Sequence, residues 1–191
     1  MMTSTPYSIP VRRNAAEYIG IIACWAALLA LLSSGRLSPL SMTVLVVLAC
    51  WTKTALFGAE NLRQLFEAAK TNLPHHRFML LMGINMSQMI LSFMFDFHLL
   101  QRINGASFSG VKPNISDAEA LFNFFYLSTL NFSFFGYSDI LPQTVAAKLL
   151  NLTEIALAFV TVIFVLSDFI SLKESLRAAP DDGEREAAPG A

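Results

Sequence analysis

Three polar residues interrupt the longest apolar stretch of the sequence at a regular spacing. Glu154, Thr161 and Asp168 follow one another every seven residues within Val145–Leu172. A seven-residue interval returns to nearly the same helix face, so the three side chains share one stripe. Ionisable side chains inside apolar spans are costly and mark ion pathways, relays or buried pairs. The stripe predicts the lining of an ion path, or else a hydrogen-bonded Glu154 and an interfacial Asp168.

Acid–base and metal chemistry have little support. Asp96 and Asp168 are the carboxylates that an intramembrane aspartyl protease would need, but they fall at opposite depths of the predicted spans. Cys24 and Cys50 stand in apolar runs without a metal-ligand set nearby. His98 lies near Asp96 at the outer end of a span, where the pair predicts an interfacial contact or a proton-sensing site. We predict no catalytic residue, no metal site and no cofactor.

Composition places these residues in a membrane protein. The chain is 54% hydrophobic and 14% charged, against about 25% charged residues in a typical soluble domain. Its 13 basic and 14 acidic residues nearly cancel, which disfavours a nucleic-acid partner. A soluble helix bundle would need a charged face on each helix, whereas a bilayer span needs about 20 apolar residues. Four stretches approach that length: Tyr18–Leu32, Leu37–Phe57, Phe78–Leu100 and Val145–Leu172.

The basic residues predict how the spans cross the bilayer. With both termini in the cytoplasm, nine Lys and Arg residues lie inside and four outside, in agreement with the positive-inside rule. Residues 1–34 also fit a signal peptide, because Arg12 and Arg13 precede a short apolar run. The later spans have the same orientation in both cases. We expect a multi-pass protein of the plasma or inner membrane.

Two further regions differ from the spans. Gly58–Leu73 has apolar residues at helical spacing and predicts an amphipathic helix on the inner membrane surface, or a solvated linker helix, that ends at Pro74. Residues 176–191 are rich in Pro, Gly and Asp, which is typical of a disordered tail.

The segment between the third and fourth spans predicts a helix too short to cross the bilayer. Ser116 followed by Glu119 fits a capping box. The apolar helix that follows, Ala120–Leu130, reaches about 21 Å with its first turn and cannot continue past Gly136. Because the fourth span begins outside, the chain must return to that side, and this path is a re-entrant loop. Non-helical backbone at membrane depth is tolerated only within protein or beside a watery cavity. The alternative is an extracellular loop with one buried amphipathic helix.

These features together resemble the pore domain of the potassium channel superfamily. In that family an outer helix and a turret precede a pore helix, a Thr-Val-Gly-Tyr-Gly-Asp filter and an inner helix. Phe134–Asp139 reads Phe-Phe-Gly-Tyr-Ser-Asp, and the following Ile-Leu-Pro resembles the family's Asp-Ile-x-Pro exit. Phe125–Leu130 resembles the pore helix, Ala147–Leu150 the start of the inner helix, and Phe97–Phe108 the turret region. The resemblance covers about Phe78–Leu172.

The resemblance implies a filter whose backbone carbonyls replace an ion's hydration shell. Its residues are Ser133, Phe134, Phe135, Gly136, Tyr137, Ser138 and Asp139. Phe134 stands in place of the family's threonine, so the hydroxyl of the innermost ion site is lost. Ser138 stands in place of the second glycine, and holding it at left-handed angles costs about 1–2 kcal/mol. Either the outer filter is reshaped, or packing imposes this strain. Glu154, Thr161 and Asp168 then line the pore or support the filter.

We therefore predict an all-α membrane protein with four transmembrane helices, plus a re-entrant pore helix and filter loop between helices three and four. Its expected regions are an N-terminal two-helix region with its linker at 1–73, a pore domain at 74–175 and the tail at 176–191. The predicted function is a potassium-channel-like cation channel in the lipid bilayer. It passes potassium or another monovalent cation and assembles as a homotetramer, since four single loops must surround one axis. The alternative is a non-conducting membrane subunit with a decayed filter. We expect no enzyme activity, soluble substrate or nucleic-acid partner.

Overall fold

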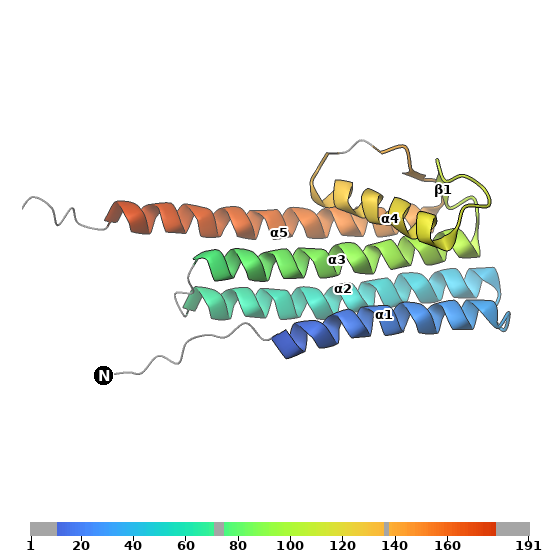
Figure 1. Ribbon diagram of the computed structural model, residues 1–191, viewed down its shortest axis with the longest axis horizontal. Helices are drawn as coiled ribbons and strands as arrows, with labels where there is room; N and C mark the ends of the chain where they lie inside the picture. Colours follow the sequence, from blue (N-terminus) through green and yellow to red (C-terminus); the bar gives the residue numbers. More distant parts are fainter. Residues whose placement is uncertain (1–10, 71–74, 136–137, 179–191) are drawn as a thin grey trace, which may run out of the picture.

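The computed structural model describes residues 11–70, 75–135 and 138–178, which form a bundle of long helices with a shorter helix packed against one end (Figure 1). The helices are α1 (Val11–Ser33), α2 (Pro39–Lys70), α3 (His75–Ile103), α4 (Asp117–Phe132) and α5 (Val145–Ala178). Two short strands, β1 (Phe108–Ser109) and β2 (Leu141–Pro142), pair antiparallel. The start of α1 and the end of α5 lie at the same end of the bundle (Figure 1). We call the opposite end, which carries residues 34–38, 104–116 and 139–144, the loop end.

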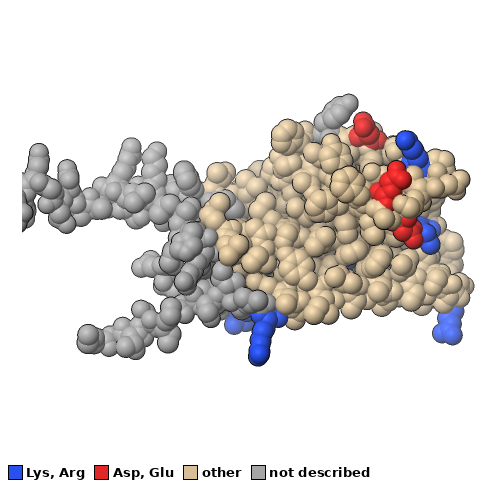
Figure 2. Space-filling view, in the orientation of Figure 1, with Lys and Arg blue, Asp and Glu red and all other residues tan. Residues whose placement is uncertain are grey.

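Four of the helices are long and apolar enough to cross a membrane. The candidate spans are Arg12–Ser33, Pro39–Ala59, Met79–Ile103 and Val145–Ile163. On the face drawn in Figure 2, the charged side chains of the described residues gather near the two ends, and the surface between them is uncharged. Exposed apolar residues on the described helices include Ile19, Leu48, Leu152 and Phe159. The mostly helical fold is consistent with the predicted all-α membrane protein.

The boundaries of α2 correct one prediction. We expected a separate amphipathic helix at Gly58–Leu73, but α2 runs without a break from the second span through Lys70. No proline stands between Pro39 and Pro74 to stop the helix, so the helical backbone simply continues. Its 32 residues extend about 48 Å, longer than a hydrocarbon core of about 30 Å. Residues 71–74 lie outside the described part of the chain, as do 179–191 of the predicted tail.

Helix α3 lies at the centre of the bundle and contacts α1, α2, α4 and α5. A cluster of buried rings joins it to the loop end. Phe108 lies 5.3 Å from Phe97 of α3 and 5.0 Å from Phe124 of α4, measured between ring centroids. Such aromatic pairs contribute about 0.5–1.5 kcal/mol each beyond the burial of their area. The cluster therefore holds α4 and β1 against α3.

Candidate functional site

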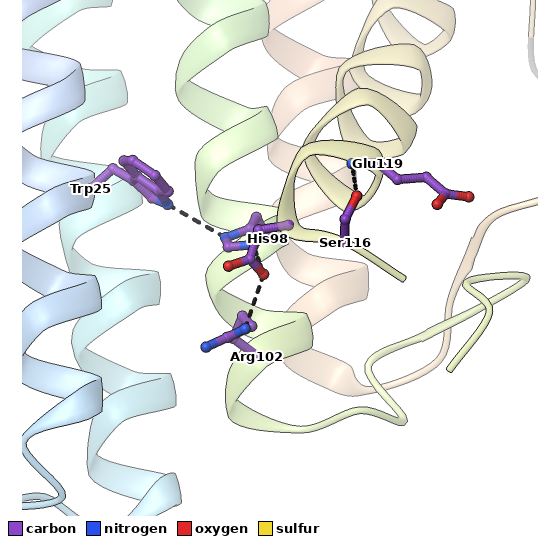
Figure 3. Close-up of polar contacts among 6 residues, drawn as sticks. Trp25, His98, Arg102, Ser116 and Glu119 are labelled. Atoms are coloured by element: carbon purple, nitrogen blue, oxygen red, sulfur yellow. Dashed lines mark hydrogen bonds and ion pairs between the residues drawn. The ribbon is translucent and has the colours of Figure 1, made fainter. Parts of the chain in front are cut away.

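The short helix α4 begins with the predicted cap. Ser116 has extended backbone angles, and its hydroxyl accepts a hydrogen bond from the backbone N–H of Glu119 at 3.2 Å (Figure 3). The carboxylates of Asp117 and Glu119 stand in the first turn, where the positive end of the helix dipole stabilises negative charge. Local sequence chemistry thus determines where α4 starts.

The other end of α4 lies deep along the bundle. The side-chain amide of Asn131 donates to Glu154 Oε2 at 2.5 Å and to Asn151 Oδ1 at 2.9 Å. Glu154 stands nine residues beyond Val145, the first residue of α5, which corresponds to about 14 Å along the helix. The hydroxyl of Ser128 reaches Ile90 O at 3.1 Å. The end of α4 therefore lies near the middle of the spanning part of α5.

Glu154 is fully buried against α4. Its carboxylate contacts the hydroxyl of Ser128 and the amide of Asn131. The hydrogen-bonded Glu154 is one of the two alternatives that the sequence predicted. Thr161 is also buried, but its hydroxyl donates to Leu157 O of the same helix at 2.9 Å. The side chain of Asp168 lies outside the described residues. Of the predicted stripe, Glu154 alone is seen to bond to α4.

Helix α4 closes with a tight turn. The N–H of Phe134 donates to Asn131 O at 3.3 Å, and the N–H of Phe135 donates to Leu130 O at 3.2 Å. These two bonds form a Schellman motif, which usually places glycine at its left-handed position. Phe134 occupies that position here, with a φ of 55°. A non-glycine residue in this conformation costs about 1–2 kcal/mol.

The left-handed residue seen at this turn is Phe134, and the prediction for Ser138 stays a prediction. Among the described residues other than glycine, a positive φ occurs at Asn114 and Phe134. The hydroxyl of Ser138 accepts the N–H of Ile140 at 3.1 Å, a contact that serine often makes with backbone two residues on. The ring of Phe134 meets Phe159 of α5 edge-on, with centroids 6.4 Å apart, and this contact offsets part of the strain.

After α4 the chain returns to the loop end. There Leu141 pairs with Ser109 in the β1–β2 ladder, which the sequence did not predict. Gly110, with a φ of 83°, lies so close to this segment that a Cβ atom on it would stand 1.9 Å from Asp139 O. The predicted filter residues Gly136 and Tyr137 lie outside the described residues. The rest of the predicted filter is exposed or half-buried in the single chain: Ser133, Phe134, Phe135, Ser138 and Asp139.

The expected pair of Asp96 and His98 is not formed. The ammonium of Lys53 on α2 lies 2.7 Å from Asp96 Oδ1, and both side chains are buried. Residues two positions apart on a helix do not face each other, so Asp96 and His98 point to different neighbours. The ion pair ties α2 to α3, and the sequence carried no signal for it beyond two charges inside apolar spans.

His98 instead joins three helices (Figure 3). The indole N–H of Trp25 on α1 donates to His98 Nδ1 at 3.4 Å. His98 Nε2 lies 3.7 Å from Asp117 Oδ1 at the start of α4, and Arg102 Nη1 lies 2.9 Å from the same oxygen. Within the described residues, no group of three or more His, Cys, Asp and Glu side chains is placed to hold a metal ion.

Comparisons with models of known protein families, with curated proteins and with solved structures found no match for this chain. The fold is what defines the class of protein: it has four candidate spans, three of which pack around the fourth, the central α3. The candidate site consists of the short capped helix α4, which ends beside the buried carboxyl group of Glu154. The resemblance to potassium channels stays a prediction.

Proposed function

We propose that the protein is a cation channel in which residues 133–139 of four copies of the chain surround one pore. The observation that carries this proposal is the depth of Asn131. It lies level with Glu154, about 14 Å inside the loop end of α5, and the chain is back at the loop end by Leu141. Backbone that is not helical at such a depth is tolerated only within protein or beside a water-filled cavity.

The exposure of this segment supports an assembly of several copies. Phe135 is 77% exposed and Phe134 is 45% exposed in the single chain. In a bilayer, a single copy would present the polar backbone around these residues to lipid. Copies related by cyclic symmetry would bury the outer side of each segment and leave its inner side facing an axis. Four copies is the number that the resemblance implies.

The direction of α4 supports a cation as the permeant ion. The C-terminal end of a helix carries about half a negative charge, and this end of α4 lies at the level of Glu154 in the middle of the bundle. Four such ends around one axis would favour a cation over an anion there. Potassium or another monovalent cation is the expected ion, with both chain termini in the cytoplasm.

Ion flux from the purified full-length chain in liposomes tests the proposal. We expect K⁺ or Na⁺ flux without Cl⁻ flux, and a cross-linked species of four chains in the same preparation. A current carried by anions, or a particle that stays monomeric in detergent and in lipid, would contradict the proposal.

One observation favours the alternative, a non-conducting membrane subunit. Phe134 closes α4 in a left-handed turn, whereas the resembling filters continue as extended backbone at the matching threonine. A chain without flux that gains K⁺ flux when Phe134→Thr and Ser138→Gly are introduced together would favour this alternative. Flux in the unaltered chain would exclude it.

A further inference from the structure

A buried histidine at the loop end stands between two different hydrogen-bonding neighbours. The side chain of His98 is 1% exposed. On one side its Nδ1 accepts the indole N–H of Trp25 at 3.4 Å, and on the other its Nε2 faces Asp117 Oδ1 at 3.7 Å (Figure 3). Nε2 has no hydrogen-bond partner within the described residues. One ring nitrogen, Nδ1, therefore accepts a hydrogen bond, whereas Nε2 lies slightly beyond hydrogen-bond distance of Asp117 Oδ1.

The donor from Trp25 determines where the proton of neutral His98 resides. An indole nitrogen only donates, so Nδ1 must be the bare nitrogen and Nε2 must carry the hydrogen. Protonation of His98 places a second hydrogen on Nδ1, directly opposite the indole N–H. The bond to Trp25 is then lost, while the new positive charge attracts the carboxylate of Asp117.

We propose that His98 is a proton-binding site at the loop end, where binding of one proton exchanges a hydrogen bond to α1 for an ion pair to the start of α4. His98 contributes to the lining of a pocket of about 410 Å³. Arg102, Lys112 and Asp117 line the same pocket, together with Gly105 and Pro113 of the loop. The inference does not depend on ion conduction, because it concerns the contacts of one residue.

Each element that packs near His98 presents a different group to it. Asp117 on α4 attracts a proton to the ring, and Arg102 on α3 opposes this while sharing the same carboxylate at 2.9 Å. Lys112 lines the pocket from the loop. Asp96, two residues earlier on α3, is paired with Lys53 of α2. Helix α1 contributes the uncharged ring of Trp25, which also stacks on Phe95 with centroids 4.7 Å apart.

Tryptophan fluorescence reads this exchange directly, since the chain has two tryptophans. A full-length Trp51→Phe variant in detergent or nanodiscs leaves Trp25 as the reporter. We expect its emission to fall in one step as pH is lowered from about 8 to about 5, because a protonated imidazole next to an excited indole takes up an electron and quenches it. Asp117→Asn should move the midpoint about one unit to lower pH, since it removes the carboxylate that stabilises the protonated ring.

Two histidine variants identify the titrating group. His98→Gln should abolish the step, whereas His76→Gln should keep it, because residue 76 stands 22 residues away on α3, about 33 Å along the helix. Emission that does not change between these pH values, or a step that persists in His98→Gln, would overturn the proposal. If His98→Gln does not fold, a midpoint that Asp117→Asn leaves unmoved would overturn it equally.

Discussion

The side-chain amide of Asn131 lies 2.5 Å from Glu154 Oε2, and this contact joins the inner end of α4 to the middle of α5. Ser128, one turn earlier on α4, contacts the other oxygen of the same carboxyl group. Both contacts lie where water is scarce, so each polar group depends on the other for its partner. The depth at which α4 ends is therefore tied to one buried carboxyl group.

Replacing Glu154 separates hydrogen bonding from charge. A glutamine amide can donate to Ser128, whose own proton goes to Ile90 O, and its oxygen can accept from Asn131. We expect Glu154→Gln to keep the free energy of unfolding within about 1 kcal/mol, and Glu154→Leu to lower it by about 1–3 kcal/mol because the amide of Asn131 loses an acceptor. Chemical unfolding in detergent micelles measures both. Equal losses in the two variants would show that the negative charge matters instead.

The buried ion pair between Lys53 and Asp96 predicts strong coupling between two substitutions. Lys53→Met or Asp96→Leu alone leaves an unpaired buried charge and should cost about 3–5 kcal/mol, whereas the double variant should be close to the original chain in stability. The exposed pair of Arg102 and Asp117 is the control, and Arg102→Gln should cost at most about 1 kcal/mol. Thermal unfolding checks the cycle, and additive single effects would contradict it.

Two glycines at the loop end predict opposite tolerance to alanine. In Gly110→Ala the new methyl group meets Asp139 O at 1.9 Å and Asp139 C at 2.8 Å at a positive φ, so Asp139 and Ile140 must shift. We expect a loss of more than about 2 kcal/mol in stability, and a loss of any ion flux. Gly105→Ala meets nothing within 4 Å and should stay within about 0.5 kcal/mol. Similar behaviour of the two variants would argue against the close approach.

The left-handed turn at Phe134 predicts that glycine is better there than alanine. Both Phe134→Gly and Phe134→Ala lose the ring contact with Phe159, but only glycine relieves the positive φ of 55°. The glycine variant should therefore be more stable than the alanine variant by about 1 kcal/mol. Urea unfolding of the two variants measures the difference. Alanine equal to or above glycine would show that Phe134 is not left-handed in the protein.

Local features of this chain were readable from its sequence. Apolar runs long enough to span a bilayer predicted the four long helices, and Ser116 with Glu119 predicted the start of α4, because hydropathy and capping act over a few neighbouring residues. The helix expected at Gly58–Leu73, on the membrane surface or as a solvated linker, is instead the continuation of α2 through Lys70, since the same helical backbone accommodates an apolar stretch and an amphipathic one in succession. The apolar helix was predicted at Ala120–Leu130 and not beyond Gly136, and α4 ends within that limit, at Phe132.

Only the tertiary structure decided which distant residues meet. The sequence grouped Asp96 with His98 because they are close along the chain, but the helix turns them apart, toward Lys53 and Asp117. Glu154 had two open roles, and the packing of α4 chose the hydrogen-bonded one. The Schellman turn at the end of α4 places a left-handed angle on Phe134, which the sequence did not predict. In each case the deciding term is burial, because a polar group or a strained residue is stabilised by partners that the fold brings from other elements.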